Sequence, residues 1–307
     1  MIYPSSLHPG DKIAIVSPAG KVNPEQVEKA RQLLESEKFV VQIFPHAFDE
    51  FHQFAGTDQV RVADMQQALD DAEVKAILFS RGGYGSLRTL MKLDWSGFDR
   101  HPKWLIGFSD ITVFHSCLSV KGVASIHGVM PAFFFEYGKR TDSLDRLLDI
   151  LRGNLLNYKV LPNYLNLPGN CRGELVGGNL SLLYSLRGTS LDLIFDGKIL
   201  FIEDISEFDY HIDRMMLNLK FGGVLSRLAG IIVGYFTETK IPGSPFGKNA
   251  YEIIREAVED LNIPVVFGFP AGHENPNYPL LMGGEITMNV DHESVEIKQT
   301  FLSNEDR

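Results

Sequence analysis

The chain has 307 residues, of which 44% are hydrophobic and 22% charged, and its formal net charge is −10 at pH 7. This composition is typical of a soluble globular protein with room for one large or two ordinary domains. The negative charge argues against nucleic acid or an anionic membrane surface as a partner, and the apolar runs are too short to span a bilayer. The two cysteines fit reduced thiols, and the first twelve residues lack an export signal, so we expect a cytoplasmic protein.

In the first half of the chain, short apolar runs alternate with segments of helical periodicity. This alternation predicts an α/β domain with an open parallel sheet. The ligand crevice of such a sheet lies beyond the carboxyl ends of its strands, which Ser17, Arg81, Ser109 and His127 all follow. The predicted strands are 12–16, 39–44, 74–79, 104–108 and 123–126.

Residues 154–170 are rich in Asn, Leu and Pro, and we interpret them as a linker between two domains. The first domain then comprises residues 1–153 and the second residues 171–307. The second half predicts a smaller, mixed α+β domain with a β-rich tail. Its predicted helices are 180–186 and 212–221, its strands 198–202, 230–233 and 265–267, and its tail 286–297.

A strand-sized apolar run at 104–106 leads almost at once into a helical pattern, and Ser109 occupies the corner between the two. A strand that turns directly into a helix with a serine at the corner is the geometry of a nucleophile elbow. The first N–H groups of the helix then face any negative charge that develops nearby. The alternative is that Ser109 and Asp110 cap the helix. Ile111 favours that alternative, because the usual elbow has a second glycine at this position.

The glycine-rich segment Arg81–Gly85 follows the third predicted strand and opens a helix. Paired glycines let backbone N–H groups approach an anion closely. We interpret the segment as a backbone donor for an oxyanion opposite Ser109, since both turns leave adjacent strand ends. A nucleotide site is a weaker alternative, because the Walker spacing and its Lys-Ser/Thr are absent. A tight turn without a ligand is also open.

A serine nucleophile needs a base, and His273 is the histidine with the best context. It follows a predicted strand and a Gly/Pro-rich loop, where functional groups are commonly presented. His115 lies on the same helix as Ser109 and cannot reach back to the corner. His127 can line the crevice, although a structural hydrogen bond is its more ordinary role.

The base in turn needs a carboxylate that orients the imidazole and stabilises its charged form. Glu203 ends an apolar strand, where a carboxylate is costly without a partner. Asp204 and Glu207 are competitors, and spacing alone does not choose among the three. The acidic run around His211 has metal-like spacing but also fits ordinary helix-start polarity. Since no zinc motif is present either, we expect no metal, and a serine nucleophile with a base and a carboxylate needs no organic cofactor.

Short segments that occur in a fixed order run through nearly the whole chain: Phe54–Thr57, Arg81–Gly85, Gly107–Asp110, His127–Gly128, Gly177–Leu180, Ile202–Asp204 with Glu207, Asp213–Arg214 and Gly272–His273. In this order they resemble the LD-carboxypeptidases, serine peptidases with a Ser–Glu–His triad that include the microcin-immunity peptidases. The resemblance implies Ser109 as nucleophile, Glu203 as orienting carboxylate and His273 as base. It also implies an oxyanion hole from the backbone N–H groups of Gly83 and Asp110, a flavodoxin-like first domain and a homodimer.

On this resemblance we expect a cytoplasmic serine carboxypeptidase that removes the terminal D-alanine from murein tetrapeptides. The third residue of the peptide, meso-diaminopimelate or lysine, stays open. One alternative is a peptidase for a peptide–nucleotide antibiotic, which would want an aromatic platform for the base, whereas Trp95 and Trp104 fall in or near the predicted core. Another is a non-catalytic protein that holds an anionic peptide. Arg81 is a candidate partner for the substrate carboxylate, although an arginine at a strand end is as often tied to a backbone carbonyl or an acid.

Overall fold

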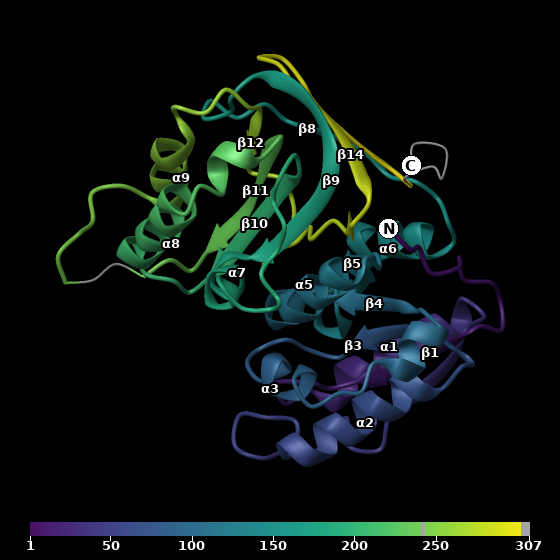
Figure 1. The fold of residues 1–307 in the computed structure, drawn as a ribbon. Helices are drawn as coiled ribbons and strands as arrows, with labels where there is room; N and C mark the ends of the chain where they lie inside the picture. Colours follow the sequence, from purple (N-terminus) through teal and green to yellow (C-terminus); the bar gives the residue numbers. More distant parts are fainter. Residues whose placement is uncertain (241–242, 302–307) are drawn as a thin grey trace. The chain divides into compact units, whose positions relative to one another are not determined.

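The computed structural model describes residues 1–240 and 243–301, which form two compact units (Figure 1). The first unit comprises Met1–Asn154 together with Tyr278–Leu281. The second comprises Leu155–Asn277 and the described residues from Met282 onward. Within these described ranges, no helix combines the length and the apolar character needed to cross a membrane.

The first unit is built on a six-stranded sheet. Five of its strands follow the order β2-β1-β3-β4-β5, all neighbouring pairs among them are parallel, and β13 lies beside β5. This is the flavodoxin-like strand order, so the predicted fold class of the first domain is confirmed. The central strands are buried along most of their length, as expected for a parallel sheet covered on both faces. The strands are β1 (Lys12–Val16), β2 (Val40–Ile43), β3 (Val74–Phe79), β4 (Trp104–Gly107), β5 (Ser125–His127) and β13 (Leu280–Met282).

Two helices of the first unit begin where the sequence supplies a capping side chain. Asn23 accepts a hydrogen bond from the N–H of Glu25 at the start of α1. Thr141 accepts one from the N–H of Leu144 at the start of α6. The helices are α1 (Pro24–Ser36), α2 (Asp58–Asp70), α3 (Ser86–Leu90), α4 (Ser96–Arg100), α5 (Thr112–Lys121) and α6 (Asp142–Leu151), with 3₁₀ turns η1 (Ser109–Ile111) and η2 (Pro131–Phe133) and a ribbon of β6 (Phe135–Glu136) and β7 (Lys139–Arg140).

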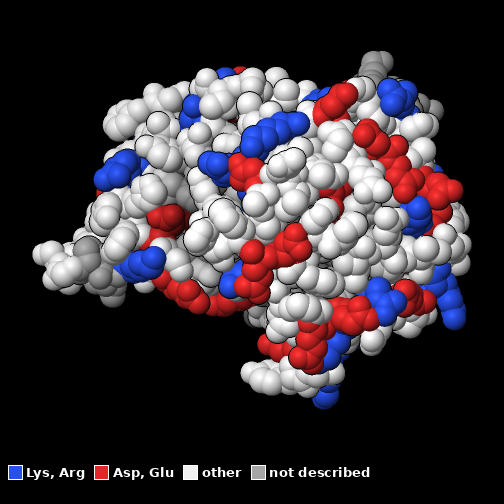
Figure 2. All heavy atoms as spheres, turned by 90° about the horizontal axis from the view of Figure 1, so that it is seen from below, with Lys and Arg blue, Asp and Glu red and all other residues white. Residues whose placement is uncertain are grey.

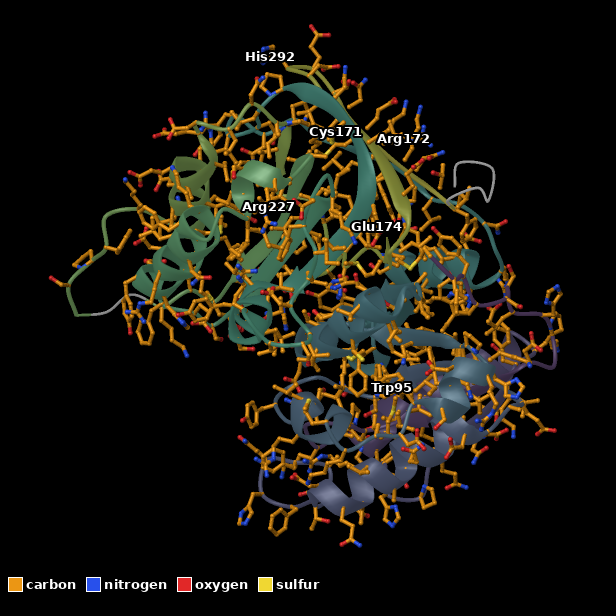
Figure 3. The ribbon with its side chains drawn as sticks, viewed as in Figure 1. Trp95, Cys171, Arg172, Glu174, Arg227 and His292 are labelled. Atoms are coloured by element: carbon orange, nitrogen blue, oxygen red, sulfur yellow. The ribbon has the colours of Figure 1, made fainter. Side chains whose placement is uncertain are left out.

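Both tryptophans take part in the packing of the first unit. Trp104 is 1% exposed, and its indole N–H donates to the carbonyl oxygen of Ser5 over 3.0 Å. Trp95 (Figure 3) packs edge-on against Phe98, with ring centroids 5.3 Å apart, and the ammonium of Lys121 lies 5.6 Å from its ring centroid. Both indoles are therefore engaged in intramolecular contacts.

The second unit is built on a seven-stranded mixed sheet with the order β12-β11-β10-β9-β14-β15-β8. Strands β9 to β12 pair in parallel, whereas β9, β14, β15 and β8 pair antiparallel. Strand β9, labelled in Figure 3 at Cys171, Arg172 and Glu174, belongs to both halves. This architecture confirms the predicted mixed, β-rich class. The strands are β8 (Asn157–Val160), β9 (Gly169–Asn179), β10 (Ile199–Ile205), β11 (Gly230–Thr237), β12 (Val265–Phe267), β14 (Glu285–Val290) and β15 (Val295–Thr300).

Most of the predicted linker 154–170 belongs to the second unit. Residues 157–160 form β8, which pairs with β15, and Leu167 forms an isolated bridge with Val265. The first unit in turn includes residues 278–281, which the sequence analysis assigned to the second domain. An Asn- and Pro-rich composition thus accompanies an edge strand here.

Three predicted strands continue beyond their expected ends, and one of them is β11, which runs to Thr237. Strand β10 continues to Ile205 because it pairs with β9 at Glu203 and with β11 at Asp204. Strand β5 extends through His127, which pairs with Gly107 of β4. Glu203 and His127 therefore lie within strands and not beyond them.

Helices α8 and α9 pack in the apolar core of the second unit together with its parallel strands. The inward face of α8 carries Met215, Met216 and Leu219, each at most 1% exposed. A capping box between Asn249 and Glu252 starts α9. The helices are α7 (Leu180–Leu186), α8 (Asp209–Phe221) and α9 (Ala250–Val258), with the 3₁₀ turn η3 (Leu225–Arg227).

The chain has a net charge of −10, and the distribution of its charged side chains over the surface bears on possible partners. On the face shown in Figure 2, basic side chains lie scattered among acidic ones and do not gather in one patch. Such a face offers little to a polyanionic partner.

Candidate active site

Ser109 lies at the corner that joins β4 to α5. Phe108 is extended, whereas Ser109 has a left-handed φ of 65°, which is uncommon for a residue with a side chain. A single 3₁₀ turn follows, and α5 begins at Thr112. Gly107 permits this tight reversal, because a Cβ at that position would lie 2.9 Å from the Ile111 side chain. Backbone strain on a serine between a strand and a helix is the expected form of a nucleophile elbow.

The structure does not support helix capping as the role of this corner. The N-cap position of α5 is Ile111, and that of η1 is Phe108. The carboxylate of Asp110 is directed to another segment, where its Oδ2 accepts a hydrogen bond of 2.7 Å from the N–H of Ser86, the first residue of α3. Ser109 and Asp110 are thus not the caps that the alternative required.

The glycine-rich turn after β3 packs directly against the elbow, because β3 and β4 are neighbouring parallel strands. A Cβ at Gly82 would lie 2.9 Å from Cβ of Ser109, 3.1 Å from its Oγ and 3.3 Å from the backbone nitrogen of Asp110. Gly83 has a φ of 102°, and the N–H of Gly20 donates to the carbonyl of Gly82 over 3.0 Å. Glycine is therefore required at 82 for close approach and favoured at 83 by the backbone conformation.

Arg81 stands exposed at the beginning of this turn. Its Nη1 donates to the carbonyl oxygen of Lys21 over 2.7 Å. This is the backbone tie that the sequence analysis considered. It uses one of the five N–H donors of the guanidinium group, so it is compatible with carboxylate binding by the others.

His115 supports the elbow from within the core. Its Nε2 lies 2.9 Å from the carbonyl oxygen of Gly107, and its Nδ1 lies 2.8 Å from the hydroxyl of Ser125. Burial lowers the pKa of His115 to about 4, so the ring is neutral near pH 7. Since a carbonyl only accepts, Nε2 carries the proton and Nδ1 accepts from Ser125. The prediction that His115 does not serve Ser109 agrees with these contacts. His127 is buried with its ring centroid 5.8 Å from that of Phe108.

In the second unit, Glu203 and His273 form a hydrogen-bonded pair. Oε2 of Glu203 lies 2.7 Å from Nδ1 of His273, and the Glu203 side chain is completely buried. Because a carboxylate accepts, Nδ1 carries the proton and Nε2 is left with its lone pair. A neutral histidine held in this tautomer by a carboxylate is equipped to take a proton at Nε2.

A β-bulge in β11 lies beside this pair. Strand β11 pairs with β10 at Val233 and again at Phe236, so two residues, Gly234 and Tyr235, oppose Glu203. The N–H of Tyr235 donates to the carbonyl of Ala271 over 2.8 Å, and a Cβ at Gly234 would lie 2.4 Å from the same oxygen. The bulge therefore fastens the loop that carries His273 to the strand beside Glu203.

The two competing carboxylates have other partners. Asp204 accepts hydrogen bonds from Asn179 Nδ2 and from the N–H of Ser181, each over 2.8 Å. Burial and the neighbouring Glu203 charge raise its pKa to about 7. Glu207 pairs with Nδ1 of His211. Of the three acids that spacing could not separate, Glu203 is thus the one bonded to His273.

The electrostatic setting of His273 favours its charged form. Burial alone would lower its pKa, but the charge of Glu203 and the hydrogen bond to it outweigh burial, and the net effect raises the pKa above the usual 6.5. Asp204 and Glu238 act in the same direction at longer range. The pair is therefore built to stabilise an imidazolium.

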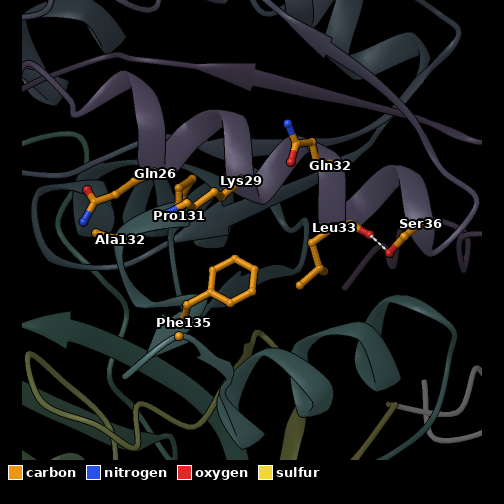
Figure 4. A pocket seen from close by; sticks show the side chains of 9 residues that line it. Gln26, Lys29, Gln32, Leu33, Ser36, Pro131, Ala132 and Phe135 are labelled. Carbon is orange, nitrogen blue, oxygen red and sulfur yellow. Dashed lines mark hydrogen bonds between the residues drawn. The ribbon is translucent and has the colours of Figure 1, made fainter.

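Two other features of the described residues bear on ligands. No group of three or more His, Cys, Asp and Glu side chains within the described ranges is arranged to hold a metal ion. A cavity of about 630 Å³ lies in the first unit between α1 and the segment 131–138 (Figure 4). Its lining includes Lys29, Leu33 and Phe135 but contains no predicted site residue.

Comparison with known proteins assigns the family. Models of the LD-carboxypeptidase N-terminal domain and the LD-carboxypeptidase C-terminal domain match residues 13–128 and 172–288, which together make up most of the chain. The chain belongs to the LD-carboxypeptidase family. The first match contains Gly83 and Ser109, and the second contains Glu203 and His273.

Individual relatives agree with this assignment. A Bacillus subtilis protein named "Probable murein peptide carboxypeptidase" is 32% identical over 309 residues, covering 96% of this chain and 94% of that protein. The structure of muramoyltetrapeptide carboxypeptidase from Oxalobacter formigenes has a TM-score of 0.85 at 28% identity and covers 95% of this chain and 100% of that one. The microcin C7 self-immunity protein MccF of Escherichia coli is 25% identical over 284 residues, or 82% of this chain and 81% of MccF. The two relatives that are named carboxypeptidases support carboxypeptidase activity for this member of the family.

The sequence analysis missed two side chains that shape the site. The sequence analysis considered the N–H of Asp110 as an oxyanion donor and its side chain as a helix cap. The structure instead shows that its carboxylate joins the elbow to α3. Asn277, which is fully buried, accepts a hydrogen bond of 3.0 Å from the N–H of Gly272, next to His273. The Asn275-Pro276 sequence before it is a turn signal, but the contact itself links residues that no short motif connects.

Proposed function

We propose that this LD-carboxypeptidase is a serine-type enzyme that removes the terminal D-alanine from murein tetrapeptides during wall recycling in the cytoplasm. Ser109 is the nucleophile, His273 the general base and acid, and Glu203 the carboxylate that orients and stabilises the imidazole. The observation that carries the proposal is the buried Glu203–His273 hydrogen bond of 2.7 Å, which leaves Nε2 as the proton acceptor. The strained Ser109 and the murein peptide carboxypeptidase relatives support it.

The proposed reaction proceeds through an acyl-enzyme. Oγ of Ser109 attacks the carbonyl carbon that joins an L-configured centre to D-alanine, while Nε2 of His273 takes the hydroxyl proton. The oxyanion of the tetrahedral intermediate accepts hydrogen bonds from the N–H groups of Gly83 and Asp110. His273 then gives its proton to the leaving amine. Water, activated by the same imidazole, releases the shortened peptide and regenerates Ser109. The triad supplies both nucleophile and proton transfer, so no metal or organic cofactor takes part in the proposal.

Cleavage of a peptide–nucleotide antibiotic is the second candidate function, favoured by the 25% identity to MccF. Recognition of such a substrate would require an aromatic side chain that stacks on the nucleobase. Trp95 and Trp104, the two tryptophans of the chain, are engaged in packing within the first unit. We therefore rank the murein peptide above the nucleotide conjugate.

A panel of tri-, tetra- and pentapeptides with meso-diaminopimelate or lysine at the third position tests the proposal. We expect release of D-alanine from the tetrapeptide and little from the pentapeptide, together with labelling of Ser109 by a serine-directed fluorophosphonate. The Ser109→Ala variant is the control for both readouts.

Release of an aminoacyl group from a sulfamoyl nucleotide, with no action on any tetrapeptide, would favour the second candidate. Absence of labelling and of turnover would favour a protein that only binds an anionic peptide. Light scattering of the same preparation tests the homodimer.

A further inference from the structure

We propose that the side chain of Asp110 is a positioning residue that sets the spacing between the two halves of the oxyanion hole. The inference rests on the proposed function, which uses the N–H groups of Gly83 and Asp110. Those two N–H groups come from different turns, one after β3 and one after β4. Something must hold the turns at a fixed distance, and the Asp110 carboxylate makes a direct hydrogen bond between them.

The bond closes a short loop of contacts within the first unit. Asp110 follows the nucleophile, and its Oδ2 accepts from the N–H of Ser86 over 2.7 Å. Ser86 lies three residues after Gly83 in the glycine-rich turn. At the other side of that turn, Gly82 leaves no space for a Cβ against Ser109. The turn is therefore fixed against the elbow by packing at one side and by the Asp110 carboxylate at the other.

Burial makes this bond resistant to competition from water. Asp110 is 3% exposed, and Ser86 is fully buried. A buried N–H that loses its acceptor costs more than an exposed one, so the pairing between Asp110 and Ser86 is strongly preferred. An oxyanion hole requires donors within tenths of an ångström of the developing charge. Loss of the bond should consequently affect the transition state more than substrate binding.

The Asp110 side chain has two separable effects on the proposed oxyanion hole: it accepts the Ser86 hydrogen bond, and its negative charge opposes the oxyanion. A carboxylate close to a developing negative charge is unfavourable for the intermediate. Burial raises the pKa of Asp110, whereas the hydrogen bonds from Ser86 and Gly85 act in the opposite direction. Asparagine at this position keeps an oxygen acceptor for the Ser86 N–H without the charge. Spacing is then preserved in Asp110→Asn and lost in Asp110→Ala.

The rate of fluorophosphonate labelling at Ser109 tests the inference without any murein substrate. We expect Asp110→Ala to label about 10²-fold more slowly than the parent, the scale of a misplaced oxyanion donor. Asp110→Asn should label at least as fast as the parent. With the tetrapeptide, Asp110→Ala should lower kcat by the same factor and leave KM within about twofold.

Asp64→Ala is the matched control. Asp64 is also a buried acid of the first unit, on α2, and both contacts of its carboxylate are with His46: it accepts a hydrogen bond from the N–H over 2.9 Å and lies 2.7 Å from Nδ1. The Asp64→Ala substitution should lower the melting temperature without slowing the labelling of Ser109. If Asp110→Ala and Asp64→Ala have the same effects, or if Asp110→Asn is as slow as Asp110→Ala, Asp110 is a structural cap and the inference is wrong. If the parent itself is not labelled at Ser109, the proposed serine mechanism fails, and the positioning role fails with it.

Discussion

Substituting Glu203 by glutamine tests the pair at the centre of the proposed chemistry. Glutamine has the same shape and can keep a hydrogen bond to Nδ1 of His273, 2.7 Å away in the parent, but it lacks the charge that stabilises the imidazolium. Two unit charges about 4 Å apart attract by about 4 kcal/mol at an effective dielectric constant of about 20. Because about 1.4 kcal/mol corresponds to a factor of ten in rate, we expect kcat/KM to fall about 10³-fold.

The pH dependence of kcat/KM gives the second readout. The Glu203 charge raises the pKa of His273 against the effect of burial, so the parent should lose activity as the pH falls through a value above 6.5. Without that charge burial dominates, the pKa falls, and the acid limb of the profile should move to lower pH in Glu203→Gln.

Asp204→Asn serves as the comparison for this shift. Asp204 is an equally buried neighbour that also raises the pKa of His273, but it makes its hydrogen bonds to Asn179 and Ser181. The acid limb of the pH profile of Asp204→Asn should also move to lower pH, but by a smaller amount than that of Glu203→Gln. An unchanged acid limb in Glu203→Gln, or a loss in rate below tenfold, would refute the assignment of Glu203 as the partner of the base.

Three further predictions concern the triad, metals and the substrate carboxylate. Ser109→Ala and His273→Ala should each abolish turnover while leaving the fold intact, and the double variant should be no worse than either, because triad members act as a unit; additive losses would contradict a shared triad. Dialysis against a strong chelator should leave tetrapeptide hydrolysis unchanged, whereas loss that zinc or manganese restores would contradict the mechanism. Arg81→Lys should raise KM for the tetrapeptide, since lysine cannot make a two-pronged contact, and should leave hydrolysis of a D-alaninamide substrate unchanged; equal losses on both substrates would make Arg81 structural.

The alternation of apolar strands and helices was sufficient to predict the parallel sheet of the first unit, because each central strand is buried on both faces and reads as a continuous apolar run. The same logic failed at the end of β10. Two acids in succession look like the end of a buried strand, yet Glu203 and Asp204 continue it, since each finds buried partners. Pairing partners of this kind come from distant segments and leave no local signal.

The choice between Glu203 and Asp204 as the partner of His273 also depends on where β10 ends. Once both lie within a strand, alternation sends their side chains to opposite faces of the sheet, so only one of them can face His273. The sequence analysis could not use this argument, because it ended the strand at Ile202. The choice of Glu203 came from the family resemblance, and its role in a triad stays a prediction.

The carboxylate of Asp110 shows a different limit. Its bond to Ser86 joins residues 24 positions apart in sequence, across two turns that follow neighbouring strands. A helix cap was the simplest local explanation for an acid at the start of a helix. Only the register of β3 and β4, which the sequence does not state, reveals the other partner.

The bulge in β11 makes the chemistry of the second unit depend on the number of residues in one strand. Val233 and Phe236 bracket Gly234 and Tyr235, one residue more than β10 has opposite them, and both flanking stretches pair regularly with β10. Loss of one residue there would restore an unbroken ladder, so the sheet could persist while the loop with His273 lost its attachment beside Glu203. A descendant of this gene could in that way keep the architecture and abandon hydrolysis in a single step. Under the proposed mechanism, the length of β11 at Gly234 and Tyr235 therefore bears on activity even where the fold is kept.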